Sequence, residues 1–386
     1  MEERLVVIHY HEIALKGNNR DFFEAVLVDN LKKSINKEDI TAVERRYGRI
    51  LVFLSENANE DSVREKIKNV FGVANFSFGF QSARDLDVLK NSIWEKVKGI
   101  DPKSFRVTVK RSDKNFPGTS QEISVDIGSF LFGKFKNVKV DLNDPDLNCY
   151  VEIGEKNTFF YFKKEKGYAG LPVGTAGKVL SLISSGFDSP VASWKMMRRG
   201  CKVVYIHFFS YPYTTKASYE NVKAIVKKLD GFQFGSKVFF VPFADIQKEI
   251  SVKSPSAQRV ILYRRIMLRI AETLAKREGI KALVTGDSVA QVASQTLDNI
   301  FVISEAVTIP ILRPLVGDNK NDIIDTATEI GTYELSAQPY EDCCSLFVPG
   351  SPETHGRLDV VLEEEEKFDA DKMIEDAIAK TEVIKF

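Results

Sequence analysis

The sequence predicts an α/β protein whose C-terminal half is a doubly wound parallel sheet. Strand-like and helix-like segments alternate along most of the chain. Segment 202–209 reads KVVYIHFF, an almost continuous apolar run of the kind found in parallel strands buried on both faces. A length of 386 residues suggests about two or three domains. Ligands of such sheets bind beyond the carboxyl ends of the strands, so the loops after strands are the first places to search for a site.

The composition is that of a globular protein without a membrane span. Hydrophobic residues make up 44% of the chain and charged residues 28%. There is no signal peptide and no apolar run of about 18 residues, so we expect a cytoplasmic protein with no membrane partner. Lys and Arg total 54, as do Asp and Glu, so net charge neither supports nor excludes a nucleic-acid partner. The four Cys and four His lack metal-ligand spacing, so no zinc or iron–sulfur centre is expected.

Residues 1–57 predict a small ferredoxin-like α/β domain. A strand is expected at 4–10, and a helix follows with an apolar face that runs from Phe22 to Leu31. Two further strands are expected within 43–54, on either side of a turn at Gly48. This order of elements is typical of a ferredoxin-like unit.

Residues 58–164 predict a second compact α/β domain. Helices are expected at 61–70, 86–97 and 123–132, and strands at 105–110, 138–140, 150–153 and 158–162. Lys110, Arg111 and Lys114 gather near Phe116, in and after the strand at 105–110. This cluster suits phosphates and an exposed base, although a few basic residues on a turn are more often merely solvated.

Residues 165–177 are rich in glycine and predict a linker into a domain at 178–386. In that domain strands are expected at 179–183, 202–209, 238–243 and 282–285, and helices after Pro190 and at 217–229, 258–277 and 372–379. Arg265 and Arg269 are spaced i, i+4 in the long helix and are expected on its surface. An acidic run, Glu363 to Glu366, lies near the C-terminus.

The loop after the strand at 179–183 reads SSGFDSP and predicts an anion site. Its small residues allow backbone N–H groups at a helix start, together with serine hydroxyls, to surround a phosphate. It is not a Walker loop, because no Gly-Lys-Ser/Thr follows the glycine at the required spacing. An ordinary strand-to-helix turn capped by serine remains the alternative.

Four segments resemble known families. SSGFDSP resembles the PP-loop SGGxDS of ATP pyrophosphatases but has Ser185 in place of a glycine, which costs about 1 kcal/mol or more only if that position needs φ > 0. FRVTVKRSDKNFPGTSQEI and VDLNDPDLNCYVEI resemble a THUMP domain, an RNA-binding module. GYAGLPVGTAGK closely resembles GxGGLPVGTSGK of the tRNA 4-thiouridine synthetases, the ThiI-type sulfurtransferases. The last resemblance covers essentially the whole chain and implies a ferredoxin-like domain, a THUMP domain and a PP-loop domain.

The resemblance implies ATP-dependent thiolation of the uridine at the eighth position of tRNA. ATP would adenylate the C4 oxygen and release pyrophosphate, after which sulfur would displace AMP. The family's nucleotide contacts match Leu182, Ile183, Ser184, Ser185, Gly186, Ser189, His207, Phe208, Arg264, Gly286 and Gln295. Asp188 is expected to act through Mg²⁺, with helix capping as its alternative, and Lys320 is suited to balancing charge during adenylation. TGDSVAQVASQTLDN departs from the family's TGxxxGQVASQTLxN at Ala290, where the family has a glycine.

Sulfur handling is assigned by the same resemblance to Cys344, in PYEDCCSLFVP, although the adjacent Cys343 offers a second thiol. The chain ends at Phe386 without the rhodanese-like domain of longer family members. We therefore expect the sulfur donor to be a separate cysteine desulfurase carrying a persulfide, or sulfide itself. The family also implies sulfur transfer toward the thiazole of thiamine through a sulfur-carrier protein. A homodimer is expected, because one tRNA could then contact the RNA-binding domain of one subunit and the active site of the other.

Two other functions stay open. The chain could be a PP-loop enzyme that activates a small carboxylate or amide, but an RNA-binding front end at residues 1–164 argues against a small substrate. It could also be an RNA-binding protein whose loop has decayed at Ser185, but intact Asp188, Gln295 and Lys320 argue against decay.

Overall fold

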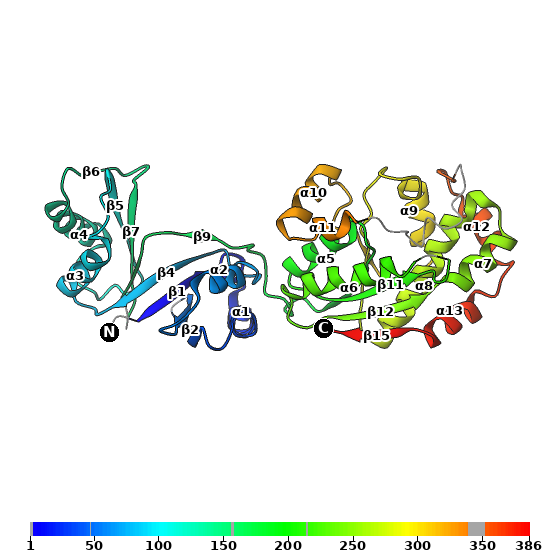
Figure 1. The fold of residues 1–386 in the computed structure, drawn as a ribbon, viewed down its shortest axis with the longest axis horizontal. Coiled ribbons are helices and arrows are strands. Elements are labelled where there is room, and N and C mark those ends of the chain that lie inside the picture. Colours follow the sequence, from blue (N-terminus) through cyan, green and yellow to red (C-terminus); the bar gives the residue numbers. More distant parts are fainter. Residues whose placement is uncertain (1–2, 47, 156–157, 214, 339–351) are drawn as a thin grey trace. The chain divides into compact units, whose positions relative to one another are not determined.

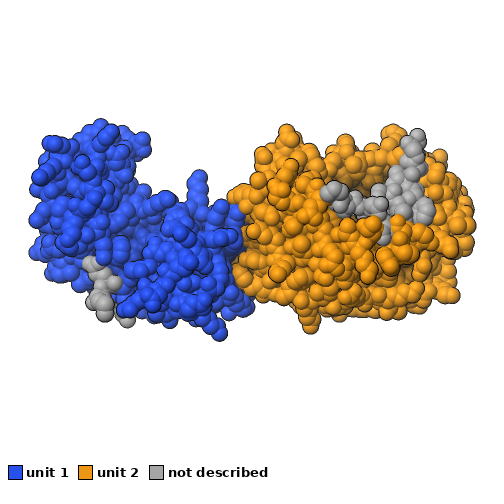
Figure 2. Space-filling model, in the orientation of Figure 1, with its two compact units in different colours: residues 1–171 blue, residues 172–386 orange. Residues whose placement is uncertain are grey.

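The computed structural model describes residues 3–386 except 47, 156–157, 214 and 339–351. The chain separates into two compact units, residues 1–171 and residues 172–386 (Figures 1 and 2). Among the described residues, no helix is both long enough and apolar enough to cross a bilayer.

Unit 1 is built on one sheet, in the order β2-β3-β1-β4-β8-β7-β5-β6, with β9 paired to β4 (Figure 1). Its strands are β1 (Arg4–His9), β2 (Ile40–Arg46), β3 (Arg49–Leu54), β4 (Asn75–Ser82), β5 (Ser104–Arg111), β6 (Lys139–Val140), β7 (Leu147–Ile153), β8 (Thr158–Tyr161) and β9 (Glu165–Lys166). Its helices are α1 (Arg20–Ser34), α2 (Glu60–Lys68), α3 (Leu86–Val97) and α4 (Ser120–Lys134), with 3₁₀ turns at Glu12–Leu15 and Gly17–Asn19. The sheet therefore continues through both predicted N-terminal domains, whose boundaries after residues 57 and 164 stay predictions.

Strand β4 connects the two halves of this sheet, and the sequence analysis missed it. It pairs with β1 on one side and with β8 on the other, antiparallel in both cases. Phe76, Phe78 and Phe80 alternate with smaller residues, which is a strand signal. A Cβ at Gly79 would lie only 2.5 Å from the carbonyl oxygen of Phe160, so glycine is what allows β8 to pair here.

Unit 2 contains a sheet in the order β14-β13-β10-β11-β12-β15. Its strands are β10 (Lys178–Leu182), β11 (Lys202–Phe209), β12 (Lys237–Pro242), β13 (Leu283–Val284), β14 (Ile311–Leu312) and β15 (Glu382–Lys385). Its helices are α5 (Asp188–Arg198), α6 (Ala217–Asp230), α7 (Ala244–Lys253), α8 (Arg259–Arg277), α9 (Leu297–Ser304), α10 (Lys320–Glu329), α11 (Tyr333–Ser336), α12 (Leu358–Glu365) and α13 (Ala370–Ala379), with 3₁₀ turns at Ser256–Gln258 and Ala293–Gln295. The pairs among β10 to β14 are parallel, whereas β15, which was not predicted, runs antiparallel to β12 at the edge.

Helices cover both faces of the unit 2 sheet. Leu180 packs into a core that it shares with α8. The next residue, Ser181, forms a 2.9 Å hydrogen bond with the hydroxyl of Ser193 on α5. Neighbouring residues of a strand point to opposite faces, so α5 and α8 lie on opposite sides of the sheet. Helix α6 packs beside α5, and α7, α9, α12 and α13 pack beside α8, which confirms the doubly wound fold.

The expectation that Arg265 lies on the surface is wrong. Arg265 is 1% exposed and donates two hydrogen bonds to the carboxylate of Glu365, on α12. Arg269 binds the same carboxylate at 2.9 Å. The acidic run is therefore not wholly solvated, because Glu365 holds α12 against α8. Sequence spacing could not reveal this, since the partners are 100 residues apart.

Candidate functional site

Strand β10 marks the point at which the strand order of unit 2 reverses. From β10 the chain adds β11 and β12 on one side, then returns through α8 to place β13 and β14 on the other. The loops after β10 and β13 separate at this point and leave a crevice between them. The loop after β10 is the serine-rich segment 183–187, and the loop after β13 is segment 285–292.

Hydrogen bonds of serine hydroxyls hold the loop after β10 in shape. The backbone N–H of Ser184 donates to Oγ of Ser189 at 2.8 Å, and the two hydroxyls lie 3.2 Å apart. Ser189 is in the first turn of α5, whose N-terminal N–H groups carry the partial positive charge that favours anions. The loop is thus closed over the helix start, as a phosphate site requires.

Ser185 does not disturb this loop. Its backbone is outside the left-handed region, so the substitution for glycine carries no strain of that kind. The side chain is 1% exposed and its hydroxyl lies 3.2 Å from the hydroxyl of Ser218 on α6. Ser185 therefore ties the loop to α6 and does not line the cavity described next.

A cavity of about 320 Å³ opens at the crevice. Ten of the eleven residues predicted to contact the nucleotide line it, with Ser185 the exception; they are Leu182, Ile183, Ser184, Gly186, Ser189, His207, Phe208, Arg264, Gly286 and Gln295. Asp188 also lines it, as do Asp287 and Gln291, which the sequence analysis did not single out. Four segments that are distant in sequence thus meet around one space.

Asp188 joins two of these segments through its carboxylate. Lys320 Nζ, at the start of α10, lies 2.7 Å from Oδ1, and Gln291 Nε2 donates to Oδ2 at 3.0 Å. Lys320 does not line the cavity, but this ion pair brings it to the cavity's rim. A Cβ at Gly286 would lie 2.9 Å from the backbone nitrogen of Ser189, so glycine is needed for the second loop to approach α5. Cation, carboxylate and helix start are therefore adjacent.

His207 serves the architecture of the site. It is 2% exposed, and its Nδ1 donates to the carbonyl of Ile183 at 2.9 Å. Its Nε2 lies 3.3 Å from the hydroxyl of Ser218. The imidazole thus fixes the end of β10.

Asp287 is the buried carboxylate of the site. Its Oδ1 pairs with Arg264 Nη2 and accepts from Gln295 Nε2 at 3.4 Å. Its Oδ2 accepts from Thr285 Oγ1 at 2.7 Å and from Arg313 Nε at 3.2 Å. Burial by itself would raise the pKa of Asp287, but the charges of Arg264 and Arg313 and the hydrogen bond from Thr285 hold that pKa below its usual value. The carboxylate is therefore ionised and holds residues of three segments.

Cys343 and Cys344 lie outside the described residues. The two described cysteines, Cys149 and Cys201, are buried, and burial raises the pKa of both thiols. Neither is a candidate for carrying sulfur, because the thiolate is the reactive form. Among the residues that the structure describes, no three His, Cys, Asp or Glu side chains gather into a metal-ligating group.

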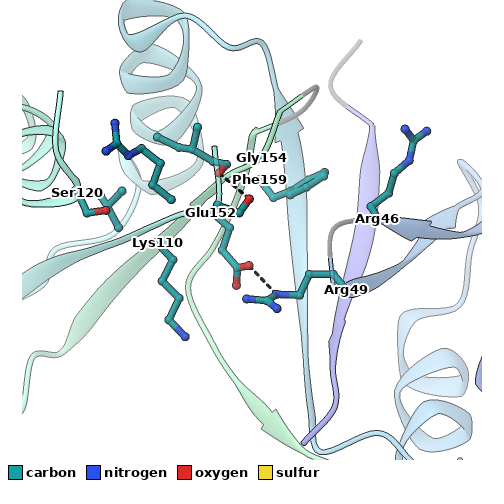
Figure 3. A pocket seen from close by; sticks show the side chains of 11 residues that line it. Arg46, Arg49, Lys110, Ser120, Glu152, Gly154 and Phe159 are labelled. Atoms are coloured by element: carbon teal, nitrogen blue, oxygen red, sulfur yellow. Dashed lines mark hydrogen bonds and ion pairs between the residues drawn. The ribbon is translucent and has the colours of Figure 1, made fainter. Parts of the chain in front are cut away.

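Unit 1 contains a second candidate site, a basic pocket of about 440 Å³ (Figure 3). Its charged lining residues are Arg46, Arg49, Lys110, Arg111 and Glu152. Glu152 accepts from Arg49 at 2.8 Å, from Tyr161 at 2.7 Å and from His9 at 2.7 Å. Four cations thus surround one carboxylate that is already paired, and the surplus positive charge suits a polyanion.

The predicted basic cluster is only partly reproduced by this pocket. Lys110 and Arg111 line it, whereas Lys114 is exposed nearby and does not. Arg111 Nη1 donates to the carbonyls of Phe116 and Gly118, so part of the hydrogen-bonding capacity of its guanidinium is used to fix the turn that follows β5. The expectation that Phe116 offers an exposed ring to a base is wrong: it is 6% exposed and belongs to the core beneath α3 and α4. Arg46 and Arg49, which the sequence analysis missed, come from the hairpin of β2 and β3.

Three family models match the chain in succession. The ThiI ferredoxin-like domain matches residues 5–77, the THUMP domain residues 86–163, and the thiamine biosynthesis protein ThiI residues 174–370. The last model covers more than half of the chain. The chain belongs to the ThiI family.

Relatives of this ThiI-family chain match it along its whole length. A probable tRNA sulfurtransferase of Caldanaerobacter subterraneus subsp. tengcongensis is 42% identical over 371 residues, which is 96% of this chain and 97% of the relative. One from Thermus thermophilus is 39% identical over 386 residues, 100% of this chain and 95% of the relative. The structure of a 4-thiouridine synthetase–RNA complex with bound ATP superposes with a TM-score of 0.91, at 34% identity and with complete coverage of both chains. A Pyrococcus horikoshii protein, PH1313, shares the fold with a TM-score of 0.67 at 24% identity, over 86% of this chain and all of its own.

Proposed function

We propose that this chain is an ATP-dependent tRNA sulfurtransferase that converts the uridine at the eighth position of tRNA to 4-thiouridine. The observation that carries the proposal is the single cavity at which the serine loop, Arg264 and the Asp188–Lys320 pair meet. The full-length relatives support the choice of substrate, since they are named tRNA sulfurtransferases.

The reaction needs an activated oxygen, because oxide is a poor leaving group. The C4 oxygen of uridine would attack the α-phosphorus of ATP, and the bond to the departing pyrophosphate would break. Backbone N–H groups and Ser189 at the start of α5 would hold the phosphates. Arg264 would bind the phosphates of ATP, and Lys320 would offset the charge that accumulates in the transition state. Sulfur would then bond to C4, and AMP would leave with the former C4 oxygen.

Asp188 is the residue that would hold Mg²⁺. A single carboxylate at the rim of a phosphate site fits this ion, which proteins commonly bind through one or two carboxylates and the phosphates themselves. The ion would screen the carboxylate from the phosphates and neutralise charge on the leaving pyrophosphate. Lys320 would remain close enough to support the same charge.

Cys344 is proposed as the thiol that handles sulfur, with Cys343 as the alternative. The donor would be a cysteine desulfurase persulfide or sulfide. With sulfide the reaction balances without a reductant, because the sulfur arrives already reduced. With a persulfide, the outer sulfur would bond to C4, a second thiol would then break the S–S bond, and an external thiol reductant would return the resulting disulfide to thiols. The name of the matched family also supports a role in supplying sulfur for thiamine, through a sulfur-carrier protein.

The basic pocket of unit 1 is proposed to bind tRNA phosphates. Arg46, Arg49 and Lys110 supply charge there, with Lys114 on the neighbouring turn. A homodimer in the cytoplasm would allow one tRNA to contact the basic pocket of one subunit and the ATP site of the other.

The test is incubation with unmodified tRNA, Mg-ATP and sulfide, scored by 4-thiouridine absorbance and by pyrophosphate release. Asp188→Asn should abolish both signals. Glu278→Gln is a matched control, because Glu278 forms a comparable 2.7 Å pair with Lys237 away from the cavity and should leave both signals intact. Cys344→Ser should retain activity with sulfide and lose it with desulfurase and cysteine.

The remaining outcomes separate the alternative functions. Pyrophosphate release that needs a small carboxylate or amide, and does not respond to tRNA, would indicate another PP-loop enzyme. Binding of tRNA without binding of ATP would identify an RNA-binding protein and refute the proposed chemistry.

A further inference from the structure

The strongest unassigned feature of the cavity is the hydrogen-bonding role of Asp287. This residue is 3% exposed, yet its two oxygens accept from four side chains. Three of the donors, Arg264, Gln295 and Thr285, line the cavity, and the first two belong to the proposed nucleotide contacts. Asp287 therefore connects to the ligand site through residues that are themselves candidates for touching the ligand.

The geometry of Arg264 shows what the carboxylate contributes. Arg264 extends from α8, its Nη2 is paired with Asp287 and its Nη1 donates to the carbonyl of Ser294 at 3.1 Å. One terminal nitrogen is thus oriented by the loop after β13 and the other by the 3₁₀ turn that follows it. A guanidinium held in this way loses little further freedom when it binds a phosphate.

The charge balance also matches an anionic ligand. Asp287 neutralises one of the two guanidinium groups that it contacts, and the other is left as a net positive charge beside the cavity. Without the carboxylate two neighbouring guanidinium groups would repel each other, and Arg264 would be free to turn away. Gln295 would lose the acceptor that fixes its amide group.

We propose that Asp287 is a positioning residue for ATP: it sets the direction of Arg264 and the amide of Gln295 and does not itself bind the nucleotide. This inference rests on the proposed function, since it assumes that the cavity takes ATP. Asp287 acts through Arg264, so the two residues should behave as one unit in binding.

The other face of α8 provides a matched control. Glu365 is a second buried carboxylate that pairs with two arginines of the protein, Arg265 and Arg269. Arg265 directly follows Arg264 in the helix, but neither it nor Glu365 lines the cavity. Glu365 belongs to α12, so replacing it removes an equivalent carboxylate from beside α8 without touching the nucleotide site.

The experiment measures equilibrium ATP binding and the KM for ATP with the full chain and tRNA, at a temperature below every variant's unfolding transition. Asp287→Asn should weaken ATP binding by about tenfold or more, because a hydrogen-bonded charge is removed from a buried pair. Glu365→Gln should lower the thermal midpoint and leave ATP binding unchanged. In the double variant Asp287→Asn with Arg264→Ala, the loss of ATP affinity should be smaller than the sum of the two single losses, because both changes remove the same Arg264 contact.

A second variant keeps the inference testable if Asp287→Asn does not fold. Thr285→Val removes one 2.7 Å hydrogen bond to the carboxylate and retains every charge, and should raise the KM for ATP by about two- to fivefold with little change in kcat. Additive losses in the double variant, or equal effects of Asp287→Asn and Glu365→Gln on ATP binding, would overturn the positioning role. Failure of the wild-type protein to bind ATP would instead refute the proposed function.

Discussion

Replacing Ala290 by glycine should stabilise unit 2. Ala290 has a φ of 62°, in the left-handed region that favours glycine, and the related family segment has a glycine at this position. Its N–H donates to the carbonyl of Gln295 at 2.9 Å, a backbone contact that glycine keeps. The side chain is exposed, so loss of the methyl group removes little packing.

The magnitude follows from two opposing terms. An L-residue in the left-handed region costs about 1–2 kcal/mol, which the change to glycine recovers. Glycine also raises the conformational entropy of the unfolded chain, which lowers the free energy of unfolding by about 0.4–1 kcal/mol. A net stabilisation of about 0.5–1 kcal/mol should raise the thermal midpoint by about 1–4 °C in a unit of this size.

Thermal unfolding of the full chain, followed by calorimetry, measures the effect. Ala224→Gly is the control, because Ala224 lies within α6, where glycine should lower the midpoint. ATP binding should be retained in Ala290→Gly, since Gln291 still follows the turn and can reach Asp188. A midpoint equal to or below that of the wild type, with ATP bound normally, would show that the conformation at position 290 carries no cost.

Three further predictions concern unit 1. Phe116→Ala should lower the free energy of unfolding by about 3–5 kcal/mol, because it leaves a cavity in the core. Phe116→Leu should keep the affinity for tRNA. If the Leu variant is stable but binds tRNA more weakly, Phe116 contacts the RNA directly. Arg49→Gln and Lys110→Gln should each remove about one phosphate contact, which lowers the slope of log affinity for tRNA against log salt concentration by about one. Unchanged slopes would show that the RNA does not bind at this pocket. Burial lowers the pKa of His9, and this effect outweighs that of its bond to Glu152. As the pH falls, His9 is therefore protonated in the unfolded chain before it is protonated in the folded protein, so stability should fall below about pH 6.5. His9→Gln should flatten the decline in thermal midpoint between about pH 7 and pH 5, and an unaltered decline would assign it to other groups.

The sequence predicted the doubly wound sheet and the serine loop because both depend on local signals, whereas the family resemblance supplied the other residues that line the cavity. A continuous apolar strand, a loop of small residues and a helix start are adjacent in the chain, and parallel strands bring their carboxyl ends to one edge. Strand β4 was missed although its phenylalanines alternate, because Gly79 lies within it and glycine is unfavourable inside a strand; its pairing with β8 depends on that same glycine. Phe116 was misjudged because a turn composed of polar residues does not reveal that one ring points into the core.

Contacts between distant segments account for what else was missed. Asp287 looks like one polar residue among several in TGDSVAQVASQT, and only the fold shows that Arg313 and Arg264 approach it from separate elements. The basic pocket likewise depends on β3 lying in the same sheet as β5 and β7, which brings Arg49 to Glu152 across 103 residues. Spacing in sequence cannot supply such partners.

Helix α8 shows how one stretch of sequence serves both stability and ligand binding. Consecutive residues of a helix point about 100° apart, so Arg264 and Arg265 diverge although both are charged and both are paired with carboxylates. Arg265 pairs with Glu365 in the interior, where an unpaired cation would be costly, and its Nη1 also lies 3.8 Å from Glu305 Oε2. These two carboxylates balance the two arginines, Arg265 and Arg269. Arg264 shares Asp287 with Arg313, which leaves positive charge beside the cavity. Matched charge on one side of α8 fixes the helix, and unmatched charge on the other side is available to an anion, so the two effects should separate when Glu365 and Asp287 are neutralised in turn.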